Sequence, residues 1–270
     1  MSFPSDGRNH RGGIKNEHSL VTSLNNGLIS RIWPTVSKNI IAEHRGGTTQ
    51  KADAVLVDTQ TGEVTNYISA KEKKKENTGT YDYTNSTSYI TQAIQNNSPV
   101  FLKLRDFINE AKNIRSTGNI TSDKKTKCRT ACKIVVENTL NSIKNTELRQ
   151  IITDLLITPN AGMEYIVTVL DTKKMYYFPF QNHKINSLLN NPDAVFFLEK
   201  KSNKEYCESR TIMVKVGNDT IDTGVRIRLH LNNGISALLG VSSTNNTSSF
   251  CIKFQQDNFD DIKEIGTVYA

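Results

Sequence analysis

The chain has 270 residues, of which 36% are hydrophobic and 23% are charged, and its formal net charge is +7. This composition supports a folded domain with a buried core. No run of about 18 apolar residues occurs, so we expect no transmembrane helix and no membrane partner. The polar first residues are unlike a signal peptide, and the four cysteines form no CxxC pair. We therefore expect an intracellular, cytoplasmic protein with reduced thiols, without a zinc site.

The N-terminal region is predicted to be an arm followed by a helix. Residues 1–13 are polar and are expected to form a flexible arm. Residues 14–33 place apolar side chains at helical spacing, and Pro34 ends the pattern. Glu17 falls in the first turn of this helix, where a carboxylate also suits the helix dipole.

The segment 51–75 predicts a β-hairpin. Residues 53–57, Asp-Ala-Val-Leu-Val, read as one strand, and residues 64–71, which are rich in Val, Thr, Tyr and Ile, read as the next. Between them, the run 58–62 ends in Gly62, which permits a tight turn.

The register of this hairpin brings three polar residues together. A turn centred on Thr61 places Asp53 opposite Ser69, and one centred on Gly62 places it opposite Lys71. Ser69 and Lys71 share one face of their strand because side chains alternate. A carboxylate, a hydroxyl and an ammonium therefore converge, and with Glu17 as a second carboxylate they would hold Mg²⁺ with waters completing the shell.

The remaining chain alternates between a helical block and a strand-rich half. Residues 98–158 carry the longest helical patterns, with a break near 145–147 and Thr146 as a candidate cap. After residue 159 the pattern changes to strands, predicted at 164–170, 175–180, 193–198, 211–216, 224–231 and 250–254.

One of these strands has a basic face. Arg226, Arg228 and His230 alternate with apolar side chains over residues 224–231. Guanidinium groups on one strand face can contact DNA phosphates or guanine edges. Lys73, which continues the second hairpin strand, is a candidate for a phosphate contact. An ordinary solvated strand face explains the same alternation.

A second stretch matches the letters of a nuclease signature. Pro192-Asp193 is followed by Glu199-Lys-Lys201. Asp193 and Glu199 are six residues apart with no turn between them, so an extended strand separates them by roughly 20 Å. Two acids that far apart cannot share a metal, and the hairpin is the better candidate.

Through the hairpin residues and Glu17, the chain resembles the PD-(D/E)xK restriction-endonuclease-like nuclease superfamily. The resemblance rests on Glu17 on an early helix, Asp53 at the start of one strand and Ser69-Ala-Lys71 on the next, and it covers roughly residues 14–97. Ser69 stands where that superfamily usually has an acid.

The resemblance implies an α/β fold, with a restriction-endonuclease-like mixed β-sheet core flanked by helices. Residues 14–97 would carry the core motifs of a single nuclease domain spanning 1–270. Residues 98–158 would be a helical insertion, and 159–270 would complete the sheet and contact DNA.

The implied activity is Mg²⁺-dependent hydrolysis of double-stranded DNA by a sequence-specific restriction endonuclease. Asp53 and Glu17 would bind metal, Lys71 would assist the attacking water, and Ser69 would bond a metal-bound water. Palindromic sites present two symmetric phosphates, which is compatible with a homodimer. Two alternatives stay open, namely a non-catalytic nucleic-acid-binding or structural protein and a nicking or junction-resolving repair nuclease.

Overall fold

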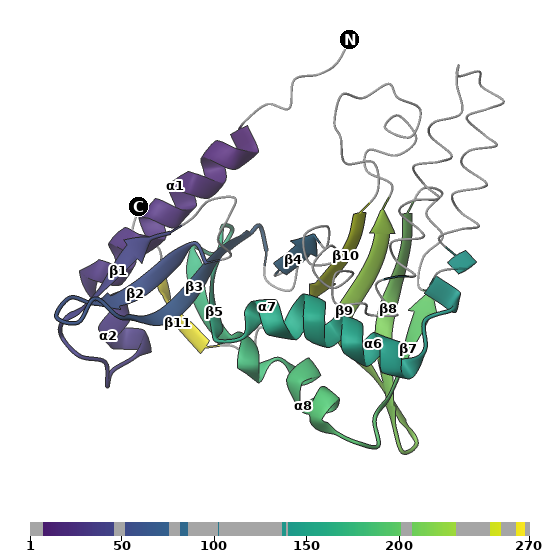
Figure 1. Ribbon diagram of the computed structural model, residues 1–270. Coiled ribbons are helices and arrows are strands. Elements are labelled where there is room, and N and C mark those ends of the chain that lie inside the picture. The colour runs from purple at the N-terminus through teal and green to yellow at the C-terminus, as the bar shows by residue number, and fades with distance from the viewer. Residues whose placement is uncertain are drawn as a thin grey trace, which may run out of the picture. The chain divides into compact units, whose positions relative to one another are not determined.

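The computed structural model describes residues 8–45, 52–75, 82–85, 102, 137–138, 140–200, 207–230, 249–254 and 263–267. The chain divides into two compact units, and Figure 1 labels most of their helices and strands. Unit 1 comprises Met1–Gly79, Pro159–His183 and Gln256–Ala270, and unit 2 comprises Thr80–Thr158 and Lys184–Gln255. Each unit has its own β-sheet, so the class is mixed α/β.

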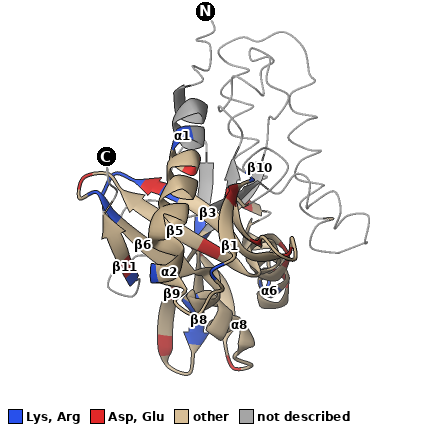
Figure 2. Ribbon diagram, turned by 90° about the vertical axis from the view of Figure 1, so that its left-hand side faces the viewer, with Lys and Arg blue, Asp and Glu red and all other residues tan. Residues whose placement is uncertain are grey.

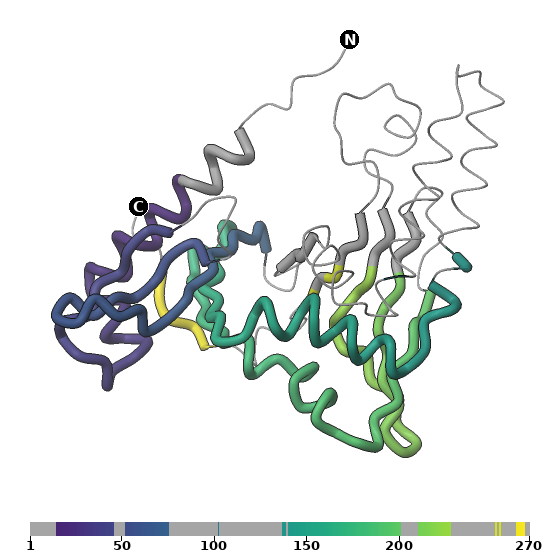
Figure 3. The backbone as a smooth tube through the Cα atoms, viewed as in Figure 1, coloured from purple at the N-terminus to yellow at the C-terminus, as the bar shows by residue number. Residues whose placement is uncertain are grey.

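Unit 1 is built on a mixed sheet with the strand order β1-β2-β3-β5-β6-β11. Its strands are β1 (Ile40–His44), β2 (Ala54–Asp58), β3 (Val64–Lys73), β5 (Met163–Val169), β6 (Lys174–Pro179) and β11 (Lys263–Thr267). β3 and β5 run parallel, and the other neighbours are antiparallel. The trace in Figure 3 shows β3 beside β5, although the intervening chain belongs to unit 2.

The predicted hairpin is confirmed as β2 and β3, and its register is the one centred on Thr61. Ala54 pairs with Ile68, and a bulge interrupts the ladder near the turn. In the turn, the Asp58 carboxylate accepts the backbone N–H groups of Gln60 at 2.8 Å and Thr61 at 3.3 Å. Gly62 adopts φ +74°, a conformation that favours glycine.

One face of this sheet is covered by the N-terminal helices. These are α1 (Arg8–Ser23), the π-helical segment η1 (Leu24–Leu28) and α2 (Ile29–Ile32). Helix and sheet share a core of buried apolar residues: Leu20, Leu24, Ile29, Ile32, Ile40, Ala42, Ala54, Leu56, Ile68, Ile166, Met175 and Ile265. The helix bends at Gly27, which has φ +112°. The side chain of Asn25 bonds both backbone groups of Ala42, which ties the bend to β1.

The predicted arm at residues 1–13 needs correction. α1 begins at Arg8, before the predicted start at residue 14, because the apolar pattern marks only the part of a helix that packs on a core. Residues 1–7 lie outside the described part. Acidic and basic residues both occur along α1 and β3 in Figure 2, whereas β1 carries the acidic Glu43.

Unit 2 contains a five-stranded antiparallel sheet with the order β4-β10-β9-β8-β7. Its strands are β4 (Asp82–Asn85), β7 (Val195–Lys200), β8 (Cys207–Val216), β9 (Asp219–His230) and β10 (Ser249–Phe254). The C-terminal half therefore supplies strands to two sheets, whereas the sequence predicted completion of one. Alternation identifies a strand but not its neighbours.

The described helices of unit 2 include α6 (Asn145–Ile152), η2 (Thr153–Ile157) and α8 (Lys184–Asn190). α6 begins at Asn145 after the predicted break, but Thr146 is not its cap. Instead, the Glu147 carboxylate accepts the Lys144 backbone N–H at 2.8 Å. The Arg149 guanidinium donates to the carbonyls of Leu189 and Asn191, both at 2.9 Å, which fixes α6 to the C-terminal end of α8.

Two short helical segments complete the described elements: α7 (Thr158–Asn160) precedes β5, and η3 (Phe180–Asn182) follows β6. Most of the predicted helical block before the break at 145–147 lies outside the described residues. Within the described part of the chain, no helix is both long and apolar enough to cross a membrane.

Candidate active site

Asp53 directly precedes β2, and backbone hydrogen bonds join it to the chain on both sides. Its N–H donates to the Ile68 carbonyl on β3 at 2.9 Å, and its own carbonyl accepts the N–H of Arg45, after β1, at 3.0 Å. The two neighbouring strands therefore fix the main chain of Asp53, and the hairpin register sets what its side chain meets.

The Asp53 carboxylate gathers its contacts on one oxygen. Oδ2 accepts the Ser69 hydroxyl at 2.9 Å and the Ala70 backbone N–H at 2.7 Å, and it lies 3.9 Å from Lys71 Nζ. Among the described residues, Oδ1 accepts no hydrogen bond. The predicted convergence of Asp53, Ser69 and Lys71 is thus present, and one carboxylate oxygen is open to a further ligand.

Burial raises the pKa of Asp53 above its usual value. The Lys71 ammonium is the largest opposing influence, followed by the hydrogen bonds from Ser69 and Ala70, while the charge of Glu17 raises the pKa further. Desolvation outweighs the effect of the Lys71 ammonium. An additional positive charge at this site would therefore stabilise the ionised carboxylate.

Lys71 is held between this carboxylate and an aromatic ring. Its Nζ lies 5.9 Å from the ring centroid of Tyr165, which is directly opposite Ser69 on β5. Tyr165 is fully buried and its hydroxyl donates to Asn160 Oδ1 at 2.5 Å. The ring is thus fixed, and a cation over an aromatic face is favourable by about 0.5–2 kcal/mol. About a quarter of the Lys71 side chain stays exposed.

Glu17 is held by His44 in the structure. Glu17 Oε2 lies 2.8 Å from His44 Nε2, and the His44 ring stacks on His18 with centroids 4.3 Å apart. Glu17 influences the Asp53 carboxylate through its charge, but no hydrogen bond joins the two among the described residues. The described residues contain no group of three His, Cys, Asp or Glu side chains that could hold a metal.

The predicted DNA-contact residues occupy different environments. Lys73 ends β3 on the same strand face as Lys71, but it is only 8% exposed. Arg226 lies on β9 of unit 2, half-buried, with its Nε buried and without a hydrogen-bond partner among the described residues. Arg228 and His230 follow on β9, but their side chains lie outside the described part. Their roles in DNA contact stay predictions.

The segment between Asp193 and Glu199, the second candidate signature, is extended as predicted. Asp193 precedes β7 in a turn, and Glu199 lies near the far end of that strand, exposed. β7 is continuous over Val195–Lys200, so no bend returns one acid to the other.

Two residues near the site were missed from the sequence. His44 ends β1 and contacts Glu17, and the sequence around it carries no motif that indicates this contact. Tyr165 was one aromatic in an apolar strand. Only the pairing of β3 with β5, which brings distant segments together, identifies it as the neighbour of Lys71.

No protein-family model, no curated protein and no solved structure matches this chain. The geometry of the site therefore carries the functional argument.

Proposed function

We propose that this protein is a Mg²⁺-dependent endonuclease that hydrolyses phosphodiester bonds in double-stranded DNA, and that it acts as a sequence-specific restriction endonuclease. The observation that carries the proposal is the convergence of Ser69 and Lys71 on the Asp53 carboxylate at one end of a hairpin. The order helix, strand, strand in which Glu17, Asp53 and Lys71 occur is also the order implied by the PD-(D/E)xK resemblance. A restriction-endonuclease-like core is part of this proposal.

The donor set fits Mg²⁺ as a cation that keeps several waters. Mg²⁺ prefers oxygen ligands and is often bound through only one or two carboxylates. Asp53 Oδ1 is open among the described residues, and the charge of Glu17 reaches the same carboxylate. Asp53 and Glu17 would hold the cation, which when bound would polarise the scissile phosphate and lower the pKa of a coordinated water.

The chain's own residues would position and stabilise the reacting groups. A water oxygen bonds to phosphorus, one P–O ester bond breaks, and the water proton passes to solvent. The Lys71 ammonium orients that water and offsets the charge that develops on the phosphate oxygens. Ser69 holds Asp53 in place through its hydroxyl, and His44 orients the Glu17 carboxylate.

Plasmid cleavage in the presence of Mg²⁺ tests the proposal. The intact chain should produce discrete fragments, which a sequence-specific enzyme gives and a random nuclease does not. Asp53→Ala and Lys71→Ala should each lower cleavage at least about 100-fold, a typical effect for one electrostatic or acid–base group. Asp193→Ala, in the alternative signature, is the matched control and should cut normally. Cleavage that persists in both hairpin variants would place the site elsewhere.

One observation favours a non-catalytic nucleic-acid-binding protein. Ser69 stands where the resembled superfamily usually has an acid, so the described site has fewer carboxylates than that pattern. Salt-sensitive DNA binding without cleavage in Mg²⁺ or Mn²⁺, across varied and differently methylated DNAs, would select this alternative. Cleavage only of branched or nicked DNA would instead indicate a repair nuclease.

A further inference from the structure

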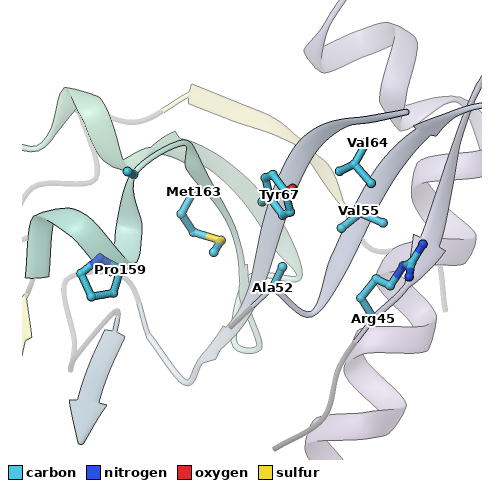
Figure 4. A pocket seen from close by; sticks show the side chains of 8 residues that line it. Arg45, Ala52, Val55, Val64, Tyr67, Pro159 and Met163 are labelled. Carbon is cyan, nitrogen blue, oxygen red and sulfur yellow. The ribbon is translucent and has the colours of Figure 1, made fainter. Parts of the chain in front are cut away.

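Unit 1 has an open pocket beside the candidate active site, shown in Figure 4. We call it the Tyr67 pocket. Its volume is about 450 Å³, and Tyr67, Val55, Met163, Ala52 and Arg45 are among its lining residues. A pocket of this size lies within the range typical of small-molecule sites.

The Tyr67 pocket lies on the same sheet face as Ser69 and Lys71 of the candidate active site. Tyr67 is directly opposite Val55 on β2 and Met163 on β5. Ser69 follows two residues later on β3, so its side chain projects from that same face. Two residues of a strand span about 7 Å. Tyr67, which lines the pocket, is therefore the neighbour of Ser69 on the same face of β3, about 7 Å along the strand.

The lining combines an exposed aromatic ring, apolar walls and a cation. Tyr67 is 48% exposed and Val64 is 36% exposed, although both are large and largely apolar. The Arg45 side chain is 43% exposed, and its Nη2 lies 3.2 Å from Glu43 Oε2. The complementary ligand has a flat apolar surface and a negative charge next to it, which describes a nucleotide.

We propose that the Tyr67 pocket binds one unstacked nucleobase adjacent to the phosphate at Asp53 and Lys71. The inference rests on the proposed function for the identity of the polyanion. In an intact duplex both faces of each base are stacked, so a base that lies on the Tyr67 ring must leave the stack. Arg45 then meets the phosphate of that nucleotide. A duplex in which one nucleotide is already unpaired should accordingly bind more tightly than a fully paired duplex, because the base need not be unstacked first.

Binding to three matched duplexes tests this inference. One duplex is fully paired, one has a single unpaired nucleotide, and one has an abasic residue at the unpaired position. Affinities are measured by fluorescence anisotropy with the full chain in EDTA at fixed salt, so that no cutting occurs. The intact chain should prefer the unpaired base over both other duplexes by about 5- to 150-fold, the range for one base–aromatic stack.

Three variants separate stacking from other effects. Tyr67→Ala should bind all three duplexes alike, and Tyr67→Phe should keep the preference because the ring remains. Leu170→Ala removes another exposed apolar side chain of unit 1, 49% exposed, and should also keep it. Equal binding of the three duplexes by the intact chain, or an unchanged preference in Tyr67→Ala, would overturn the inference.

The outcomes also distinguish this inference from the proposed function. Metal-dependent cleavage without any preference for the unpaired base would refute the pocket assignment and leave the nuclease intact. A preference that depends on Tyr67, in a chain that never cuts DNA, would support the pocket and reject the nuclease.

Discussion

The ion pair between Lys71 and Asp53 gives the most direct test of the site. Lys71→Met removes the charge and keeps a side chain of similar length. The two charged atoms are 3.9 Å apart, and about a quarter and a fifth of the two side chains are exposed. At about 4 Å, two unit charges interact by about 1 kcal/mol in water and by about 4 kcal/mol at an effective dielectric constant of 20. The pair lies between these limits because both side chains are only partly exposed.

Loss of Lys71 should raise the pKa of Asp53 further. Burial already raises the pKa of this carboxyl, and Lys71 is the strongest influence that lowers it. Removing the cation penalises only the ionised form, so the sign of the change is upward. Titration of aspartate carboxyl signals by NMR, with Asp53→Asn to assign the resonance, measures it directly.

Lys74→Met is the matched control for this titration. Lys74 directly follows β3 and is exposed, and no ion pair joins it to Asp53 among the described residues. Its loss should leave the Asp53 titration unchanged. An Asp53 pKa that stays constant or falls in Lys71→Met would refute the electrostatic reasoning, because the ammonium would then not stabilise the carboxylate.

Three further predictions concern the same unit. Ser69→Asp places a second carboxylate beside Asp53, so thermal unfolding without divalent cation should occur at lower temperature, and added Mg²⁺ should raise the unfolding temperature more than in the intact chain. Burial raises the pKa of Glu164, so the folded state favours the protonated carboxyl. The resulting contribution to the free energy of unfolding is complete below the ordinary glutamate pKa and is lost as pH rises through the folded-state pKa. In thermal unfolding across that window, Glu164→Gln should show a smaller decline than the intact chain; an equal decline would contradict this. Leu56→Ala, at a fully buried core position, should lower the free energy of unfolding by about 2–5 kcal/mol in urea titrations, and a loss below about 1 kcal/mol would contradict the packing.

The hairpin was predictable because its signals are local. Short runs of apolar and β-branched residues define both strands, and Gly62 and Asp58 fix the turn between them. Once the turn is centred on Thr61, counting residues places Asp53 opposite Ser69. The three-residue cluster therefore follows from about twenty consecutive residues.

The surroundings of that cluster depend on contacts between distant segments. Tyr165 reaches Lys71 only because β5 pairs in parallel with β3. His44 reaches Glu17 because Asn25 ties the bent helix to β1. Neither contact leaves a periodic signal in the sequence. The same limit explains why the strands from β5 to β10 were recognised, while β11 and the division of the strands between two sheets were not.

The serine at position 69 is consistent with the electrostatics of its surroundings. Ser69 is 1% exposed, and its hydroxyl donates a hydrogen bond to the Asp53 carboxylate. Burial already disfavours the ionised form of that carboxylate. A second acid there would repel Asp53 and force one of the two to keep its proton. The hydroxyl instead stabilises the ionised form with no added charge. Any divalent cation at this site must then draw its remaining negative charge from outside β3, and Glu17 is the carboxylate whose charge already reaches Asp53.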